Sequence, residues 1–272
     1  MPRSIRPVRV NHINMVLEDF DSAIAHFQSL YDADFLADYP QAEWHAGLFE
    51  IGRTIFEPFV PPAWLLSSRY GPHYLGIEYQ ADMDMVRTAI ADHGIRIVRD
   101  IGLALHTHPA DTLGVAFEFY DGAFHDREWE RLGRAMRSAE YWRDDHPFGL
   151  TGLRGIALVV EDGDGAAAFL RSFLSAEPAY EEERPAIAAH AVGLTVADAL
   201  VELLVPVGEG PIRRHLDRHG PGMRSTMMGV RDIGRAQFHF AERGLTLALG
   251  DRPGSFAIPA EENMGVIFEF VP

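Results

Sequence analysis

The pattern of hydrophobic and polar positions divides the chain into short apolar runs that alternate with amphipathic segments. The first run covers residues 8–19, is largely apolar, and carries His12 in its first half. The segment at 21–31 repeats apolar residues at helical spacing, and Asp19 just before it can cap a helix. The pattern predicts a unit of one strand, one helix and three further strands, the last three at residues 34–39, 44–51 and 53–60.

A similar strand-then-helix unit occurs three more times along the chain. The second unit begins at Gly71, and its predicted helix, at 83–93, is ended by Gly94. Residues 113–119 read Leu-Gly-Val-Ala-Phe-Glu-Phe, and residues 264–270 read Met-Gly-Val-Ile-Phe-Glu-Phe. Four copies of a βαβββ unit predict an α+β fold made by duplication, because one unit is too small to bury a core alone. The third and fourth copies are predicted to have strands at 153–162 and 223–231, followed by helices at 165–174 and 235–243.

A charged stretch in the middle of the chain marks the boundary between two halves. Residues 128–142 have the spacing of a charged amphipathic helix, and residues 143–150, with Pro147 and Gly149, are typical of a turn. We therefore predict an N-terminal module at 1–125, a helical linker at 126–150 and a C-terminal module at 151–272.

Composition narrows the possible functions. With no cysteine, the chain forms no disulfide, has no thiol nucleophile and offers no thiolate to a metal. A formal net charge of −16 argues against nucleic acid, because phosphate binding needs a basic face. No apolar run approaches the roughly 18 residues needed to cross a membrane, and the N-terminus lacks the apolar core of a signal peptide. We expect a cytoplasmic protein that binds neither nucleic acid nor a membrane.

Two histidines and two glutamates in the first half are the candidate site residues. His12 and His73 lie in corresponding strands of the first two units. Glu57 and Glu118 each lie inside an apolar run, in the last strand of their unit. A carboxylate buried in such a strand is costly unless a cation or strong donors compensate it. If the two units pair about a pseudo-twofold axis, the four side chains converge, and such a set can hold a divalent metal ion.

The second half has no histidine at the positions that correspond to His12 and His73. The positions that correspond to His12 are Gly155 and, within one residue, Ser225, although Glu202 and Glu269 keep the glutamate positions. Without imidazoles we expect no tight transition-metal site there. The second half would then serve packing or frame a substrate pocket.

Four other side chains could take part in the chemistry. His106 and His108, just ahead of a turn, suggest a second metal pair, but we expect them to line the mouth of a pocket or contact solvent. Glu43 or His45 could act as a general base, or either could be a rim residue. The chain shows no Ser-His-Asp signature, nucleophile elbow or dinucleotide fingerprint.

These motifs together resemble the vicinal oxygen chelate superfamily, which includes glyoxalase I, methylmalonyl-CoA epimerase, extradiol dioxygenases and bleomycin-resistance proteins. The run Val10-Asn11-His12-Ile13, followed by Glu18-Asp19, is similar to the family's opening strand, and Gly71-Pro72-His73 is similar to the second. Residues 108–118, ending in Glu118, resemble the loop and final strand of the epimerases. The resemblance spans essentially the whole chain, as four βαβββ units paired into two modules.

The resemblance implies a ligand set, because in this family the metal ligands come from the first and last strands of paired units. Carried over, the ligands are His12, Glu57, His73 and Glu118. The epimerases often have an amide where this chain has Glu57, whereas glyoxalase I has a glutamate there, so the subfamily stays open. The implied cofactor is one divalent ion: Zn, Ni, Co, Mn or Fe(II).

The leading hypothesis is a metal-dependent lyase or isomerase acting on a small substrate with two neighbouring oxygens. The ion would polarise a carbonyl while Glu57, Glu118 or Glu43 moves the α-proton. The first alternative is an extradiol-type Fe(II) dioxygenase, whose sites favour two histidines and one carboxylate. The second is a metal-free protein that binds an antibiotic or aromatic metabolite in an apolar cleft. A monomer or a homodimer fits either case.

Overall fold

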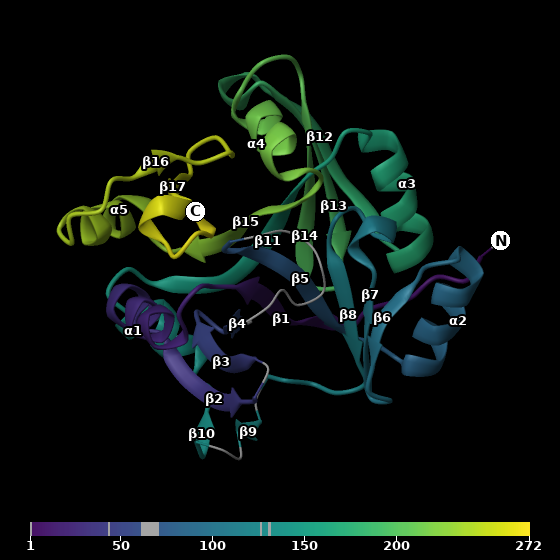
Figure 1. Ribbon diagram of the computed structural model, residues 1–272. Helices are drawn as coiled ribbons and strands as arrows, with labels where there is room; N and C mark the ends of the chain where they lie inside the picture. Colours follow the sequence, from purple (N-terminus) through teal and green to yellow (C-terminus); the bar gives the residue numbers. More distant parts are fainter. Residues whose placement is uncertain (1, 43, 61–70, 126, 130–131) are drawn as a thin grey trace. The chain divides into compact units, whose positions relative to one another are not determined.

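A computed structural model describes residues 2–42, 44–60, 71–125, 127–129 and 132–272 (Figure 1). The strand and helix pattern predicted from the sequence is present in all four copies. The first copy contains β1 (Arg9–Val16), α1 (Phe20–Tyr31), β2 (Asp34–Pro40), β3 (His45–Ile51) and β4 (Thr54–Val60). The second contains β5 (His73–Gln80), α2 (Met83–His93), β6 (Ile97–Asp100), β7 (Ala104–Thr107) and β8 (Ala116–Tyr120).

The second half repeats this order, and the helix α4 follows the last strand of the third copy. The third copy contains β11 (Leu150–Val159), α3 (Gly163–Leu174), β12 (Glu177–Arg184), β13 (Ala189–Val196) and β14 (Ala199–Pro206), followed by α4 (Pro211–His219). The fourth contains β15 (Gly222–Val230), α5 (Ile233–Ala241), β16 (Ala248–Leu249), β17 (Phe256–Ile258) and β18 (Ile267–Val271).

The helices that follow the first strand of each copy begin in the same way. Asp19 accepts a hydrogen bond from the backbone N–H of Ser22 at 2.8 Å, as the sequence predicted. Such a cap satisfies one of the backbone donors that an α-helix leaves unpaired at its N-terminus. The same bond recurs at the other three helices, where the caps are Asp82, Asp162 and Asp232.

The strands form two eight-stranded sheets, so the predicted α+β class is confirmed. Their orders are β2-β3-β4-β1-β5-β8-β7-β6 and β12-β13-β14-β11-β15-β18-β17-β16, which are the same pattern repeated. In each copy the first strand pairs in parallel with the last, as β1 does with β4 and β5 with β8. The parallel pairs place the ends of the βαβββ unit side by side.

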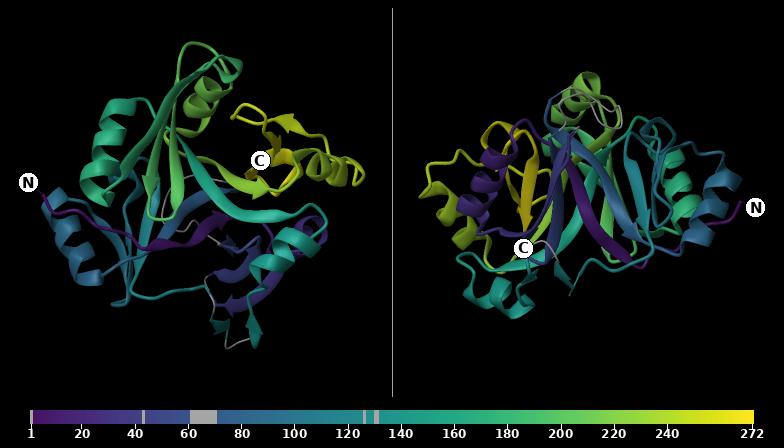
Figure 2. Two further views of the ribbon diagram at one scale, coloured as in Figure 1. Left: turned by 180° about the vertical axis from the view of Figure 1, so that it is seen from behind. Right: turned by 60° about the horizontal axis from the view of Figure 1, so that its bottom comes forward.

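The chain folds into two compact units, each of which combines copies from both halves. One unit contains residues 1–11, 75–123 and 155–224; the other contains residues 12–74, 124–154 and 225–272. Each unit has an aromatic core. In the first, Phe173 of α3 packs against Phe119 of β8, and the backbone N–H of Ile5 donates to the carbonyl of Phe173 as the N-terminal segment passes between α2 and α3 (Figure 1). In the second, Tyr31 of α1 contacts Phe240 of α5, and these helices lie side by side in Figure 2.

The predicted helix over residues 128–142 is wrong. Within the described residues, β9 (Glu128–Trp129) pairs with β10 (Arg134–Ala135) as a short antiparallel ribbon, and a π-helix (Tyr141–Asp145) follows. Gly133 has a φ of 60°, which ends any helix there. Trp129 and Met136 are buried against Leu36, Ala37, Leu48 and Ile55. Tertiary burial of Trp129 therefore overrides the helical spacing of the segment, and the linker is not helical along its length.

Candidate metal centre

The strand β1 carries His12 into a buried position beside Glu57. β1 and β4 run in parallel, with Asn14 opposite Glu57 in the ladder. Only 2% of the His12 side chain is exposed, and its Nε2 lies 2.9 Å from Oε2 of Glu57. The ring of Phe124 lies 5.0 Å from the imidazole. Glu57 keeps 16% of its side chain exposed, so it remains accessible to a small molecule where His12 is covered.

Three neighbouring strands bring a second group of titratable side chains together. Glu118 of β8 lies opposite Glu78 of β5 on one side and opposite His106 of β7 on the other. All three residues are buried. His106 Nε2 lies 3.0 Å from Oε1 of Glu118, and Asn11 Nδ2 donates to Oε1 of Glu78 at 3.0 Å. Two carboxylates are therefore held next to each other inside the protein.

His73 is buried at the start of β5, and its Nδ1 lies 2.7 Å from the carbonyl oxygen of Gly71. A histidine held in this way presents its Nε2 to a ligand, as metal-binding histidines commonly do. Side chains alternate along a strand, however, so His73 and Glu78 project from opposite faces of β5. The role of His73 as a metal ligand stays a prediction.

Glu78 is the site residue that the sequence analysis missed. It lies in the apolar run Leu75-Gly76-Ile77-Glu78-Tyr79, which is the same signal that singled out Glu57 and Glu118. His12, Glu78 and Glu118 are buried, and each offers a side-chain atom that can ligate a metal. Neighbouring buried carboxylates repel each other unless a positive charge or a proton compensates them. The donor chemistry of an imidazole and two carboxylates therefore fits a divalent ion such as zinc, manganese or iron.

The third copy compensates its buried glutamate with a side chain of the protein. Glu202, at the position of Glu57, is fully buried. It accepts a hydrogen bond from Nη2 of Arg184 at 2.8 Å and another from the hydroxyl of Tyr180. The guanidinium, itself 2% exposed, supplies the positive charge that a metal would otherwise supply.

In the fourth copy, too, donors of the protein reach the buried glutamate, Glu269. It accepts hydrogen bonds from the backbone N–H of Arg252 and the hydroxyl of Ser255. These contacts give a physical reason for the expectation that the second half has no tight transition-metal site.

The other side chains singled out in the sequence have separate surroundings. His45 Nε2 lies 2.6 Å from Oδ1 of Asp38, and its ring stacks on Phe20. His108 does not share the environment of His106, because its Nδ1 accepts from the backbone N–H of Ala110 and caps a short 3-10 helix. Glu43 lies outside the described residues.

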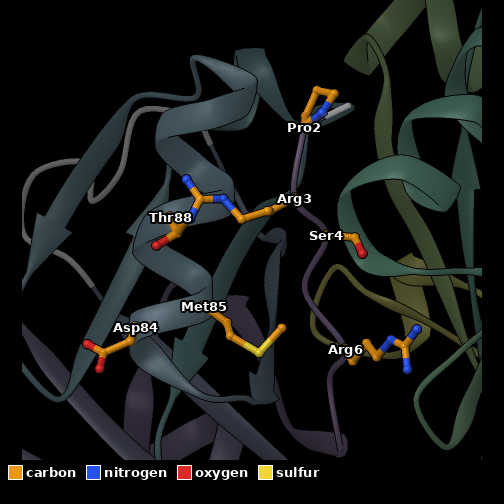
Figure 3. Close-up of a pocket in the computed structure, with 7 residues that line it drawn as sticks. All are labelled: Pro2, Arg3, Ser4, Arg6, Asp84, Met85 and Thr88. Atoms are coloured by element: carbon orange, nitrogen blue, oxygen red, sulfur yellow. The ribbon is translucent and has the colours of Figure 1, made fainter.

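A surface groove of about 580 Å³ lies between the N-terminal segment and α2 (Figure 3). The Arg3 side chain, which lines the groove, forms an ion pair with Asp92, with Nε of Arg3 2.9 Å from Oδ2 of Asp92. The groove contains none of the buried carboxylates, so we do not assign the chemistry to it. It is lined by Pro2, Arg3, Ser4, Arg6, Asp84, Met85 and Thr88.

Two solved structures match this protein over most of its length, and a third matches less than half of it. A triple mutant of 4-hydroxymandelate synthase from Streptomyces coelicolor matches with a TM-score of 0.72 and 15% identity, over 97% of this chain and 92% of that one. A fusion of a xylose isomerase-like TIM barrel with 4-hydroxyphenylpyruvate dioxygenase gives a TM-score of 0.68 and 13% identity, over 99% of this chain and 49% of that one. Methylmalonyl-CoA epimerase from Mycobacterium tuberculosis is 25% identical, over 45% of this chain and 87% of that one, with a TM-score of 0.42.

No family model matches the chain, and no curated protein is similar to it in sequence. Among the described residues, every helix is too short or too polar to cross a membrane. At these identities the two long structural matches establish the fold and leave the activity open. Together with the repeated βαβββ copies, they show that this chain has the fold of the vicinal oxygen chelate superfamily.

Proposed function

We propose that the protein is a metal-dependent enzyme of the vicinal oxygen chelate type, with His12, Glu78 and Glu118 as the main ligands of one divalent ion. The observation that carries the proposal is the pair of buried glutamates on adjacent strands, Glu78 opposite Glu118. An enzyme gains from such a pair because a bound cation is then both held tightly and shielded from water. His73 and Glu57, which the sequence resemblance favours, are the competing ligands.

The reaction we propose is removal of a proton next to a carbonyl of a small, oxygen-chelating substrate, as in a lyase or isomerase. A bound divalent ion would polarise the carbonyl and stabilise the negative charge that develops on it. The chain has neither cysteine nor lysine, so thiolate attack and a lysine Schiff base are both excluded. Proton transfer therefore falls to carboxylates, imidazoles or tyrosine hydroxyls.

Glu57 is our choice for the group that moves the proton. Its carboxylate lies beside His12 and is partly exposed, so it can reach a substrate that enters the site. A carboxylate placed in this way can take a proton from one carbon and return it to another, or to the other face of the same carbon. Glu118 is the alternative, but it is buried and lies against His106.

Metal content tests the first part of the proposal. As-isolated protein is compared by elemental analysis with four single variants: His12→Ala, His73→Ala, Glu78→Gln and Glu118→Gln. We expect about one divalent ion per chain, lost in every variant except His73→Ala. If Glu78→Gln retains the metal and His73→Ala loses it, His73 rather than Glu78 is the metal ligand. Protein without metal, whose His12→Ala variant still binds aromatic ligands, would instead show a metal-free binding protein.

Solvent exchange tests the reaction. Metal-loaded protein is incubated in deuterium oxide with 2-hydroxycarbonyl compounds, hemithioacetals and acyl thioesters, and deuterium at the α-carbon is followed by NMR. We expect incorporation into one class, and a loss of at least about 100-fold in Glu57→Gln, which keeps its metal. In parallel, protein loaded anaerobically with Fe(II) is given catechols and oxygen. Oxygen uptake without α-proton exchange would make the protein a dioxygenase and contradict our assignment.

We further propose a small molecule as the only partner of the site, and a cytoplasmic monomer or homodimer as the working form. Gel filtration with light scattering measures the oligomeric state directly.

A further inference from the structure

A neighbouring polar side chain contacts each of the two buried carboxylates of β5 and β8. Asn11 Nδ2 donates to Oε1 of Glu78 at 3.0 Å and to the carbonyl oxygen of Gly122 at 2.8 Å. Since an amide nitrogen carries two hydrogens, both are used, and the amide plane is fixed. Asn11 is itself fully buried. The orientation of the Glu78 carboxylate is therefore determined by a side chain that cannot easily turn.

Glu118 is held from its other side by His106. The two residues face each other across the β7–β8 ladder, and His106 Nε2 lies 3.0 Å from Oε1 of Glu118. His106 Nδ1 is buried and has no hydrogen-bond partner within the described part of the chain. Of its two ring nitrogens, Nε2 faces the carboxylate, so we assign a proton to Nε2, and His106 donates to Glu118.

We propose that Asn11 and His106 are positioning residues, which fix the two carboxylates in the orientation that binds the metal ion. Neither residue belongs to the ligand set proposed for this ion or to the competing set, and this inference rests on the proposed function. A carboxylate that is already oriented loses less side-chain entropy when it binds an ion than one that is free to turn. Removal of such a partner typically weakens metal binding by about 10- to 100-fold.

The test measures metal affinity separately from folding. Metal-free protein is titrated with Co(II), and the dissociation constant is obtained from its visible absorption and by competition with a chelator. We expect His106→Leu to bind Co(II) at least about tenfold more weakly than the wild type. His106→Gln places an amide donor near the same position, so it should recover most of the affinity. His108→Leu is the matched control: His108 caps a 3-10 helix, so the variant should lose some thermal stability but keep its Co(II) affinity.

The possible outcomes separate this inference from the proposed function. If wild-type protein does not bind Co(II), or if Glu118→Gln binds it normally, the metal site itself is wrong. If the wild type binds and His106→Leu binds equally well, His106 does not position Glu118. Equal weakening in His106→Leu and His106→Gln would also overturn the inference, because a donor would then not suffice. If His106→Leu does not fold, Asn11→Leu makes the same test at Glu78, and unchanged affinity there refutes the proposal.

Discussion

Glu50, on β3, makes stability depend on pH in a way that one substitution can isolate. Its side chain is fully buried, and it accepts hydrogen bonds from Nε1 of Trp142 at 2.8 Å and from the backbone N–H of Arg137 at 2.9 Å. Burial disfavours the charged form and raises the pKa of Glu50 from 4.5 to about 7, although the two donors partly offset this. The folded protein therefore holds a proton on Glu50 that the unfolded chain releases near pH 4.5.

The sign of the effect follows from proton binding. Between pH 4.5 and about 7 the folded state binds more protons at Glu50 than the unfolded state does, so the free energy of unfolding falls as pH rises. A shift from 4.5 to about 7 corresponds to about 3 kcal/mol, since one pKa unit is about 1.4 kcal/mol. Most of that loss, about 2 to 3 kcal/mol, falls between pH 5 and pH 8.

Glu50→Gln removes the titration and keeps most of the shape. The amide loses one of the two hydrogen bonds, but this cost of about 1 kcal/mol does not change with pH. Urea unfolding of both proteins at pH 5 and pH 8, with a chelator present, gives the free energies of unfolding. We expect the wild type to lose about 2 to 3 kcal/mol relative to the variant between the two pH values. An equal difference at both pH values would refute the raised pKa and its cause.

The remaining predictions concern three other buried positions. Arg184→Met should reduce the free energy of unfolding by about 3 to 5 kcal/mol, because it leaves Glu202 charged and buried, and adding Glu202→Gln should restore much of it. Burial lowers the pKa of His146 to about 4, so the wild type should lose stability as pH falls from 6.5 to about 4, and His146→Gln should remove this slope in urea unfolding. Gly76→Ala would place a Cβ 2.0 Å from the carbonyl oxygen of Ala116 and so push β5 and β8 apart. We expect a lower temperature of thermal unfolding and, in a Co(II) titration, weaker binding.

The sequence predicted those features that depend on neighbouring residues. The helix at Met83–His93 was placed correctly because the apolar residues at helical spacing and Gly94 after it are local signals. The pairing of Glu78 with Glu118 could not be found in this way, because the register of β5 against β8 joins residues 40 positions apart. Trp129 shows the same limit, since its burial against β2, β3 and β4 determines the local structure.

Because Arg184 neutralises Glu202, the charge balance at Glu202 does not depend on a supply of metal ions. A counter-ion that belongs to the chain is synthesised with it, cannot be extracted by a chelator and does not vary with nutrient supply. On the proposed function, metal starvation would therefore be felt by the N-terminal half, while the third copy keeps its charge balance. If the copies arose by duplication, the third copy has an arginine where the N-terminal half is proposed to bind a metal ion. The third copy would then stay folded when no metal ion is bound.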